Sequence, residues 1–163
     1  MKHVFKAVTC ILIISFSSSS CSKSTDASTS ATAATKTQLL TSSDWIIIGL
    51  EYRKETATTW TDDYALWLAC QKDNKFVFKT NNSYEFNEGA SKCNPSDPQI
   101  LQAGTWQLTS NETVLAIQQE TNGTDAFNAN IESLTSNSLI FSYITKIGGS
   151  FGSTYYYKYS FKR

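Results

Sequence analysis

The sequence predicts an all-β fold, an eight-stranded antiparallel up-and-down barrel with one short helix. From Leu39 onward, short runs of β-branched and aromatic residues are separated by Asn, Gly and Ser, which is typical of strands joined by tight turns. Large apolar residues recur at every second position within these runs, so each strand has one apolar face. Antiparallel strands of this kind can remove both sheet edges by closing into a barrel, and a sandwich of two sheets is the alternative.

The strands follow one another along the chain with turn signals between them. Residues 61–71 break the alternation and predict the short helix, with Thr61 or Asp62 as its N-cap. The predicted turns, rich in Asn, Ser and Gly, lie at 81–82, 110–111, 122–123, 136–137 and 148–152. The predicted strands cover residues 45–53, 75–80, 83–88, 104–109, 113–119, 126–134, 138–145 and 154–161.

The N-terminus has the layout of a secretory signal. Lys2 and Lys6 precede or flank the start of an apolar stretch, and four serines lead directly into Cys21. A run of small residues before such a cysteine resembles a bacterial lipoprotein signal, in which the cysteine becomes the lipidated first residue. The resemblance implies a membrane-anchored lipoprotein of the bacterial cell envelope, held at the outer membrane through Cys21. Plain secretion with Cys21 as a free thiol is the alternative.

Three segments are therefore expected in the chain. Residues 1–20 are the lipoprotein signal peptide. Residues 21–38 form a flexible tether, because the stretch after the cysteine contains only small and polar side chains without any period. Residues 39–163 form the barrel, and the length of the chain is that of one domain.

The cysteines of the barrel predict a disulfide. Once Cys10 is removed with the signal and Cys21 is lipidated, Cys70 and Cys93 remain as one pair in an oxidising compartment. A redox pair or a metal site is the alternative, although the spacing is not CxxC. His3 is the only histidine and lies in the signal, so the mature chain has no imidazole for a metal site, a triad or a dyad. We expect no metal, no cofactor and no catalytic residue.

The charge balance of the chain gives no support for nucleic-acid binding. The chain has 14 basic and 14 acidic residues and no basic cluster, so nucleic acid is not an expected partner, and we expect a monomer. The carboxylates that could serve acid–base chemistry have simpler roles as caps, strand residues or loop residues. A buried pair of them in a cleft would instead favour an enzyme. They are Asp62, Asp63, Glu85, Glu88 and Asp97.

Several motifs occur together in the barrel segment: LLTSSDW, LACQKDNKFVF, EGASKCNP, AGTWQL and NIESLTSNSLIF. In combination they resemble the lipocalin-like domain proteins found as small lipoproteins in Bacteroidota, over residues 39–163. The resemblance implies a lipocalin-like barrel. Lipocalins proper carry a GxW motif whose Trp closes the base of the barrel beneath a late Arg. Trp45 takes the Trp position here, Ser43 replaces the Gly, and Arg163 or Lys162 is the late cation.

A barrel of eight strands has a lumen wide enough for side chains or for one small ligand. The function expected first is therefore binding of a small apolar or amphipathic molecule, without catalysis. The candidate ligand-binding residues are Trp106, Phe141, Tyr143, Tyr155 and Tyr157, with tyrosine hydroxyls orienting the ligand. The same aromatic side chains also suit a filled core, so a solid interior is the alternative.

Trp60 and Trp67 lie outside the strand pattern, beside Tyr64. If both are exposed, they could stack on sugar rings, and the protein would be an accessory interaction module that presents its loops to a glycan or a protein partner. The alternative is that this short aromatic segment plugs one end of the barrel, where the disulfide of Cys70 holds it.

Overall fold

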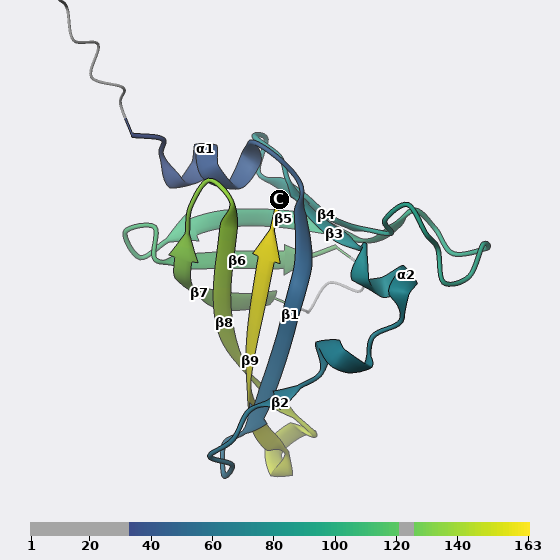
Figure 1. The fold of residues 1–163 in the computed structure, drawn as a ribbon. Helices are drawn as coiled ribbons and strands as arrows, with labels where there is room; N and C mark the ends of the chain where they lie inside the picture. Colours follow the sequence, from purple (N-terminus) through teal and green to yellow (C-terminus); the bar gives the residue numbers. More distant parts are fainter. Residues whose placement is uncertain (1–32, 121–125) are drawn as a thin grey trace, which may run out of the picture. The chain divides into compact units, whose positions relative to one another are not determined.

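The computed structural model describes residues 33–120 and 126–163, which form a closed antiparallel barrel of eight strands (Figure 1). The first and last barrel strands pair from Ile46 opposite Lys162 to Lys54 opposite Tyr155, so the predicted closure is confirmed. A short additional strand, β2 (Thr61–Asp62), pairs with the end of β1. The barrel strands are β1 (Trp45–Lys54), β3 (Lys75–Phe78), β4 (Ser83–Asn87), β5 (Ile100–Thr109), β6 (Val114–Gln119), β7 (Ala126–Leu134), β8 (Ser138–Ile147) and β9 (Ser153–Lys162).

The strands occupy the predicted positions to within a few residues, except that β5 begins well before the expected residue 104. Consecutive barrel strands are neighbours in the sheet, as the turn signals between them indicate. The backbone φ angle is positive at Asn82, Ser110 and Asn111, which are residues of two predicted turns. The predicted turn at 122–123 lies outside the described residues.

The core lies inside the barrel, where every barrel strand contributes at least one buried apolar side chain. Its aromatic rings contact one another across strands, as in the edge-to-face pair of Phe76 and Phe161 with ring centres 5.6 Å apart. Burial of each large apolar side chain contributes about 1.5–3 kcal/mol, so this set stabilises the closed barrel. The core residues are Leu40, Trp45, Ile47, Phe76, Phe78, Tyr84, Trp106, Leu115, Ile117, Ala129, Leu139, Phe141 and Phe161.

Helix α1 (Lys36–Thr41) begins inside the segment that the sequence assigns to the tether, so the folded part starts earlier than expected. A capping box explains its start: Thr35 Oγ1 accepts a hydrogen bond from the N–H of Gln38, and Gln38 Oε1 accepts one from the N–H of Thr35. Leu40 is fully buried and packs the helix against the core. The predicted signal peptide, Cys21 and the predicted tether up to residue 32 lie outside the described residues.

The prediction of a single helix over residues 61–71 is wrong, because this segment forms a short strand, a 3₁₀ turn and a short helix. Its first two residues pair with β1 as β2 and are therefore extended. A 3₁₀ turn, η1 (Tyr64–Leu66), and a short helix, α2 (Ala69–Lys72), follow. Trp67 between them is extended, with φ −69° and ψ 142°. Asp62 still acts as a cap, since its Oδ1 accepts a hydrogen bond from a backbone N–H of the 3₁₀ turn at 3.0 Å.

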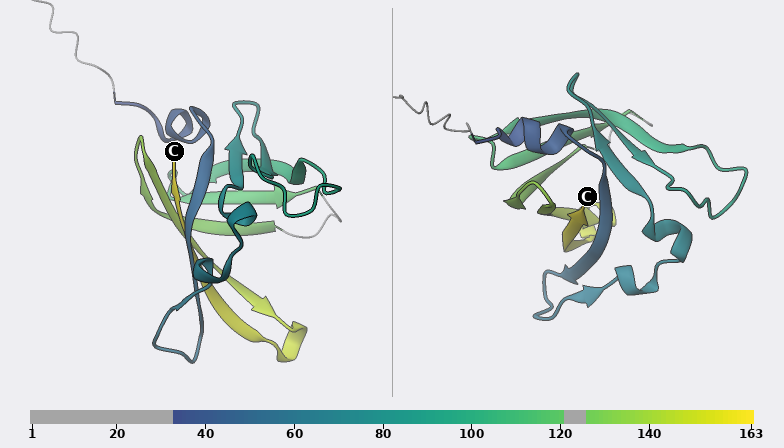
Figure 2. Two further views of the ribbon diagram at one scale, coloured as in Figure 1. Left: turned by 45° about the vertical axis from the view of Figure 1, so that its right-hand side comes forward. Right: turned by 45° about the horizontal axis from the view of Figure 1, so that its top comes forward.

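The Cys70–Cys93 disulfide is present, with 5.2 Å between the Cα atoms. It joins α2 to the long loop before β5, and both lie on the same side of the barrel (Figure 2). The predicted glycine loop contains a 3₁₀ turn, η2 (Gly149–Phe151), and Gly148 before it has a φ of 100°. In the part of the chain that the structure describes, no helix is long and apolar enough to cross a membrane.

Candidate functional site

One end of the barrel is closed by α1 and the C-terminal residue, as the position of the C-terminus beside α1 in Figure 1 shows. Trp45 is fully buried there, and its Nε1 donates a hydrogen bond to the carbonyl of Leu40 at 2.9 Å. The guanidinium of Arg163 lies 4.3 Å from the centre of the Trp45 ring and donates to the carbonyl of Leu39. Lys162 is exposed, so the late cation over this tryptophan is Arg163.

The interior of the barrel is not completely filled. A cavity of about 280 Å³ lies inside it, and all eight barrel strands contribute to its wall. We call it the lumen cavity. Among the predicted ligand residues, Phe141 and Tyr143 line it, whereas Trp106, Tyr155 and Tyr157 do not. Two of the five predicted residues therefore line the lumen cavity.

The wall of the lumen cavity is mainly aromatic and contains a few polar groups. Gln119 Nε2 donates a hydrogen bond to Gln102 Oε1 at 3.3 Å. The rings of Tyr143 and Tyr159 stack with their centres 6.0 Å apart, so their two hydroxyls belong to the same part of the wall. Burial raises the pKa of both tyrosines, so the two hydroxyls are neutral at physiological pH. Amides and neutral hydroxyls among aromatic rings suit an apolar or amphipathic ligand.

Tyr84 adds a hydroxyl that is buried without a hydrogen-bond partner in the described part of the chain. Burial, with a smaller contribution from the charge of Glu120, raises its pKa to about 12. The ring packs against Gly104, its cross-strand neighbour. A Cβ at that glycine would lie 2.7 Å from the ring and 2.0 Å from the carbonyl oxygen of Gln118. Gly104 therefore sets the position of the Tyr84 ring at the cavity wall.

Tyr155 and Tyr157 continue the aromatic face of β9 beyond the lumen cavity, toward the turn between β8 and β9. Both rings contact Tyr52 on β1, with ring centres 6.3 and 6.0 Å apart. Tyr157 also stacks on Tyr143, with ring centres 5.3 Å apart. Burial, followed by the charge of Asp63, raises the pKa of Tyr157. These side chains form a tyrosine ladder that leads to the cavity.

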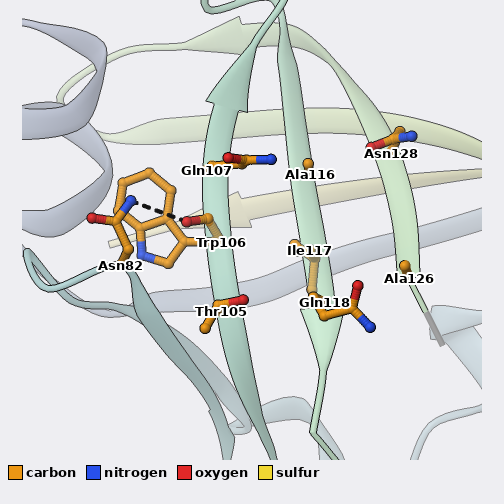
Figure 3. Close-up of a pocket in the computed structure, with 9 residues that line it drawn as sticks. All are labelled: Asn82, Thr105, Trp106, Gln107, Ala116, Ile117, Gln118, Ala126 and Asn128. Atoms are coloured by element: carbon orange, nitrogen blue, oxygen red, sulfur yellow. Dashed lines mark hydrogen bonds between the residues drawn. The ribbon is translucent and has the colours of Figure 1, made fainter. Parts of the chain in front are cut away.

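Trp106 belongs to the core and not to the lumen cavity. It is 3% exposed, its Nε1 donates a hydrogen bond to the carbonyl of Lys79 at 3.1 Å, and its ring meets Phe78 edge to face. Trp106 also borders a hollow of about 580 Å³. Figure 3 shows Gln107 on β5 and Gln118 on β6 there, beside small side chains such as Ala116. This hollow lies open on the outside of the sheet, so it does not enclose a ligand.

The two tryptophans of the alternative surface site lie in different surroundings. Trp67 lines the lumen cavity and contacts Tyr64, with ring centres 5.6 Å apart. Trp60 is 39% exposed, and the cationic groups of Arg53 and Lys158 lie 5.3 and 5.2 Å from its ring centre. Trp60 is therefore held by cation–π contacts on the barrel exterior.

A second cavity of about 290 Å³ lies between α2 and the loop before β5, and Trp67 and Phe86 line both cavities. We call it the side cavity. Two of the carboxylates singled out in the sequence line it: Glu88, which is 4% exposed, and Asp97, which is half-buried. Only one of them is buried, so they are not the buried pair that would favour an enzyme. The described residues contain no cluster of three or more side chains suited to hold a metal ion.

The other candidate carboxylates have structural partners. Glu85 accepts a hydrogen bond from Lys79, which is the main reason why the pKa of Glu85 is lowered. Asp63 Oδ2 accepts from Nε1 of Trp67 at 3.4 Å and so helps to hold this ring at the cavity. Together with the capping role of Asp62, these contacts leave Glu88 and Asp97 as the two candidate carboxylates whose side chains have no such partner in the described part of the chain.

Sequence reasoning missed the polar members of the lumen cavity, Gln102 and Gln119. The alternation of the strands could have revealed them, because residues separated by an even number of positions face the same side of a strand. Gln102 therefore shares the inward face of β5 with Trp106, and Gln119 shares that of β6 with Ile117. A polar residue at an inward position of a barrel strand faces the lumen, which makes it a candidate ligand contact.

A scan against protein-family models gives no match, and a search of curated proteins gives none either.

Proposed function

We propose that the protein binds one small apolar or amphipathic molecule inside the barrel and catalyses no reaction. The lumen cavity of about 280 Å³ carries this proposal. Its volume is near the lower limit of small-molecule sites, about 300 Å³, and its wall combines aromatic side chains with a few polar groups, as such sites do. A core packed only for stability would leave few voids larger than a water molecule.

The arrangement of the barrel ends supports the same function. Trp45, Leu40 and Arg163 seal one end with hydrogen bonds and a cation–π contact. Trp67 lines the lumen cavity, and the tyrosine ladder continues from Tyr143 at its wall. A closed end of this kind would help to retain a small molecule in the lumen. We include in the proposal a lipocalin-like up-and-down barrel, anchored in the bacterial outer membrane through lipid on Cys21.

A matched pair of glutamine variants tests the proposal. Gln102 and Gln107 are on the same strand, β5, but only Gln102 lines the lumen cavity, whereas Gln107 is exposed on the outside. Decanol serves as a neutral amphipathic probe, and its binding is measured by isothermal titration calorimetry. We expect saturable binding at one site in the unsubstituted protein. Gln102→Phe fills part of the cavity and should weaken binding about ten-fold or more, and Gln107→Phe should leave it unchanged.

Native mass spectrometry of the protein purified from its source provides a second measurement. A small molecule that leaves with the protein under gentle conditions supports the proposal. A bare mass, together with no saturable decanol binding, would contradict it. Equal weakening by Gln102→Phe and Gln107→Phe would place the probe outside the lumen cavity and would contradict it as well.

A further inference from the structure

Gln102 on β5 and Gln119 on β6 bring two side-chain amides together at the wall of the lumen cavity. Gln119 Nε2 donates a hydrogen bond to Gln102 Oε1 at 3.3 Å, so each amide uses one of its two groups on the other. In the described part of the chain, Gln102 Nε2 and Gln119 Oε1 have no partner, and both atoms keep accessible surface. The pair therefore has both a donor and an acceptor to offer a ligand.

The lumen cavity has no charged side chain among the described residues that line it. Burial is the main cause of the raised pKa of Tyr84 at the wall, and the negative charge of Glu120 adds to it. An anionic ligand group would therefore meet negative charge nearby and no cation in the wall. A cationic group would find no carboxylate in the wall either. Burial of an ionised group without a partner is costly, so this cavity favours an uncharged ligand.

The other polar groups of the wall are tyrosine hydroxyls. That of Tyr84 has no partner but also almost no accessible surface, so it is closed to a ligand. Those of Tyr143 and Tyr159 are neutral, because burial raises the pKa of both side chains. The amide pair is thus the part of the wall that combines an accessible N–H donor with an accessible carbonyl acceptor. The remaining wall side chains are apolar or aromatic: Ile47, Trp67, Phe76, Phe86, Phe127 and Phe141.

On the basis of the proposed function, we propose that the ligand is an uncharged molecule with a carboxamide-type group, an N–H donor next to a carbonyl acceptor, which pairs with Gln102 and Gln119. The carbonyl of such a group accepts from Gln102 Nε2, and its N–H donates to Gln119 Oε1. A ketone or an ester only accepts, and a carboxylate only accepts and carries charge. The apolar part of the ligand contacts the aromatic side chains of the wall.

Three probes of similar shape test this inference: octanamide, heptyl methyl ketone and octanoate. They share one apolar chain, and the ketone has a methyl group and octanoate a charged oxygen in place of the amide nitrogen. Affinities are measured by isothermal titration calorimetry. Because an amide is hydrated more strongly than a ketone, a site without partners for its N–H groups would bind the ketone more tightly. We expect octanamide to bind at least as tightly as the ketone, and octanoate to bind about ten-fold or more weakly than octanamide.

A double variant removes both amides from the wall. Gln102→Met/Gln119→Met keeps unbranched side chains of similar length, so the ketone should then bind about ten-fold or more tightly than octanamide. The matched control is Gln107→Met/Gln118→Met, which changes the exposed, outward glutamines of the same two strands. The control variant should keep the order of affinities of the unsubstituted protein.

The outcomes separate this inference from the proposed function. Binding of the ketone by Gln102→Met/Gln119→Met shows that this variant is folded and that its cavity is open. Tighter binding of the ketone than of octanamide by the unsubstituted protein would overturn the amide assignment, and so would octanoate binding as tightly as octanamide or an unchanged order in Gln102→Met/Gln119→Met. In each of these cases saturable binding in the lumen cavity stands. If decanol and all three probes fail to bind, both proposals are overturned.

Discussion

Reduction of the Cys70–Cys93 disulfide should destabilise the barrel without preventing its formation. The two cysteines are 23 positions apart in the sequence. In the chain-entropy account, closing a loop of this length stabilises the folded state by about 3 kcal/mol. The barrel itself is held by strand pairing and by a core in which neither cysteine takes part. The loss should therefore lower stability and leave the fold in place.

The size of the effect on the melting temperature follows from the size of the folded unit. That unit spans residues 33–163. Unfolding entropy near the midpoint is about 2.1 cal/mol/K per residue, so a loss of about 3 kcal/mol lowers Tm by about 10 °C. Cys93 is exposed, which gives a reductant access to the bond.

The assay is thermal unfolding followed by circular dichroism, with and without a phosphine reductant. The unsubstituted protein should melt about 10 °C lower when reduced. The double variant Cys70→Ala/Cys93→Ala should melt at the lower temperature in both conditions, which controls for other effects of the reductant. Equal melting temperatures for the oxidised and reduced protein would refute the reasoning, and so would loss of the β-sheet spectrum at low temperature.

Three further predictions concern individual side chains. Leu40→Ala removes a fully buried contact between α1 and the core, so denaturant unfolding should show a loss of about 2–5 kcal/mol; no loss would mean that α1 is not part of the folded unit. Gly104→Ala places a Cβ 2.0 Å from the carbonyl of Gln118 and should cost at least about 2 kcal/mol in the same assay, whereas a neutral result would contradict the close packing. Burial raises the pKa of Tyr84 from 10.0 to about 12, so its contribution to stability is complete below the unfolded pKa and falls as the pH rises toward the folded one. The free energy of unfolding, measured with urea, should therefore fall between about pH 9 and about pH 11 by about 1 kcal/mol less in Tyr84→Phe than in the unsubstituted protein. Equal falls in the two proteins would count against this burial.

Local patterns in the sequence were sufficient for the strands and their order. A strand with one buried face alternates between apolar and polar residues, and this alternation is readable in a few residues, as in Phe76 and Phe78 on β3. The capping box of Thr35 and Gln38 was equally local, but its place in an expected tether concealed it. The helix expected at 61–71 failed for the opposite reason, because pairing of β2 with β1 overrides the local preference.

The candidate site depended more strongly on the tertiary structure. Alternation shows that Tyr143 and Tyr157 point inward, but only Tyr143 lies at the height of the barrel where the lumen cavity is. Likewise, nothing near Glu88 in the sequence shows that α2 and the loop before β5 enclose it. Such burial depends on segments that meet in space, and those contacts are not encoded in the neighbouring residues.

The sequence by itself determined the strand order, the inward faces and the pair of cysteines that would be joined, because each follows from short-range periodicity or from the small number of candidates. Only the tertiary structure decided how much of the lumen is empty, which side chains border that space, and that the amides of Gln102 and Gln119 meet at its wall. The physical reason is that a cavity is the volume left over when side chains from every strand have packed, and no single segment specifies it.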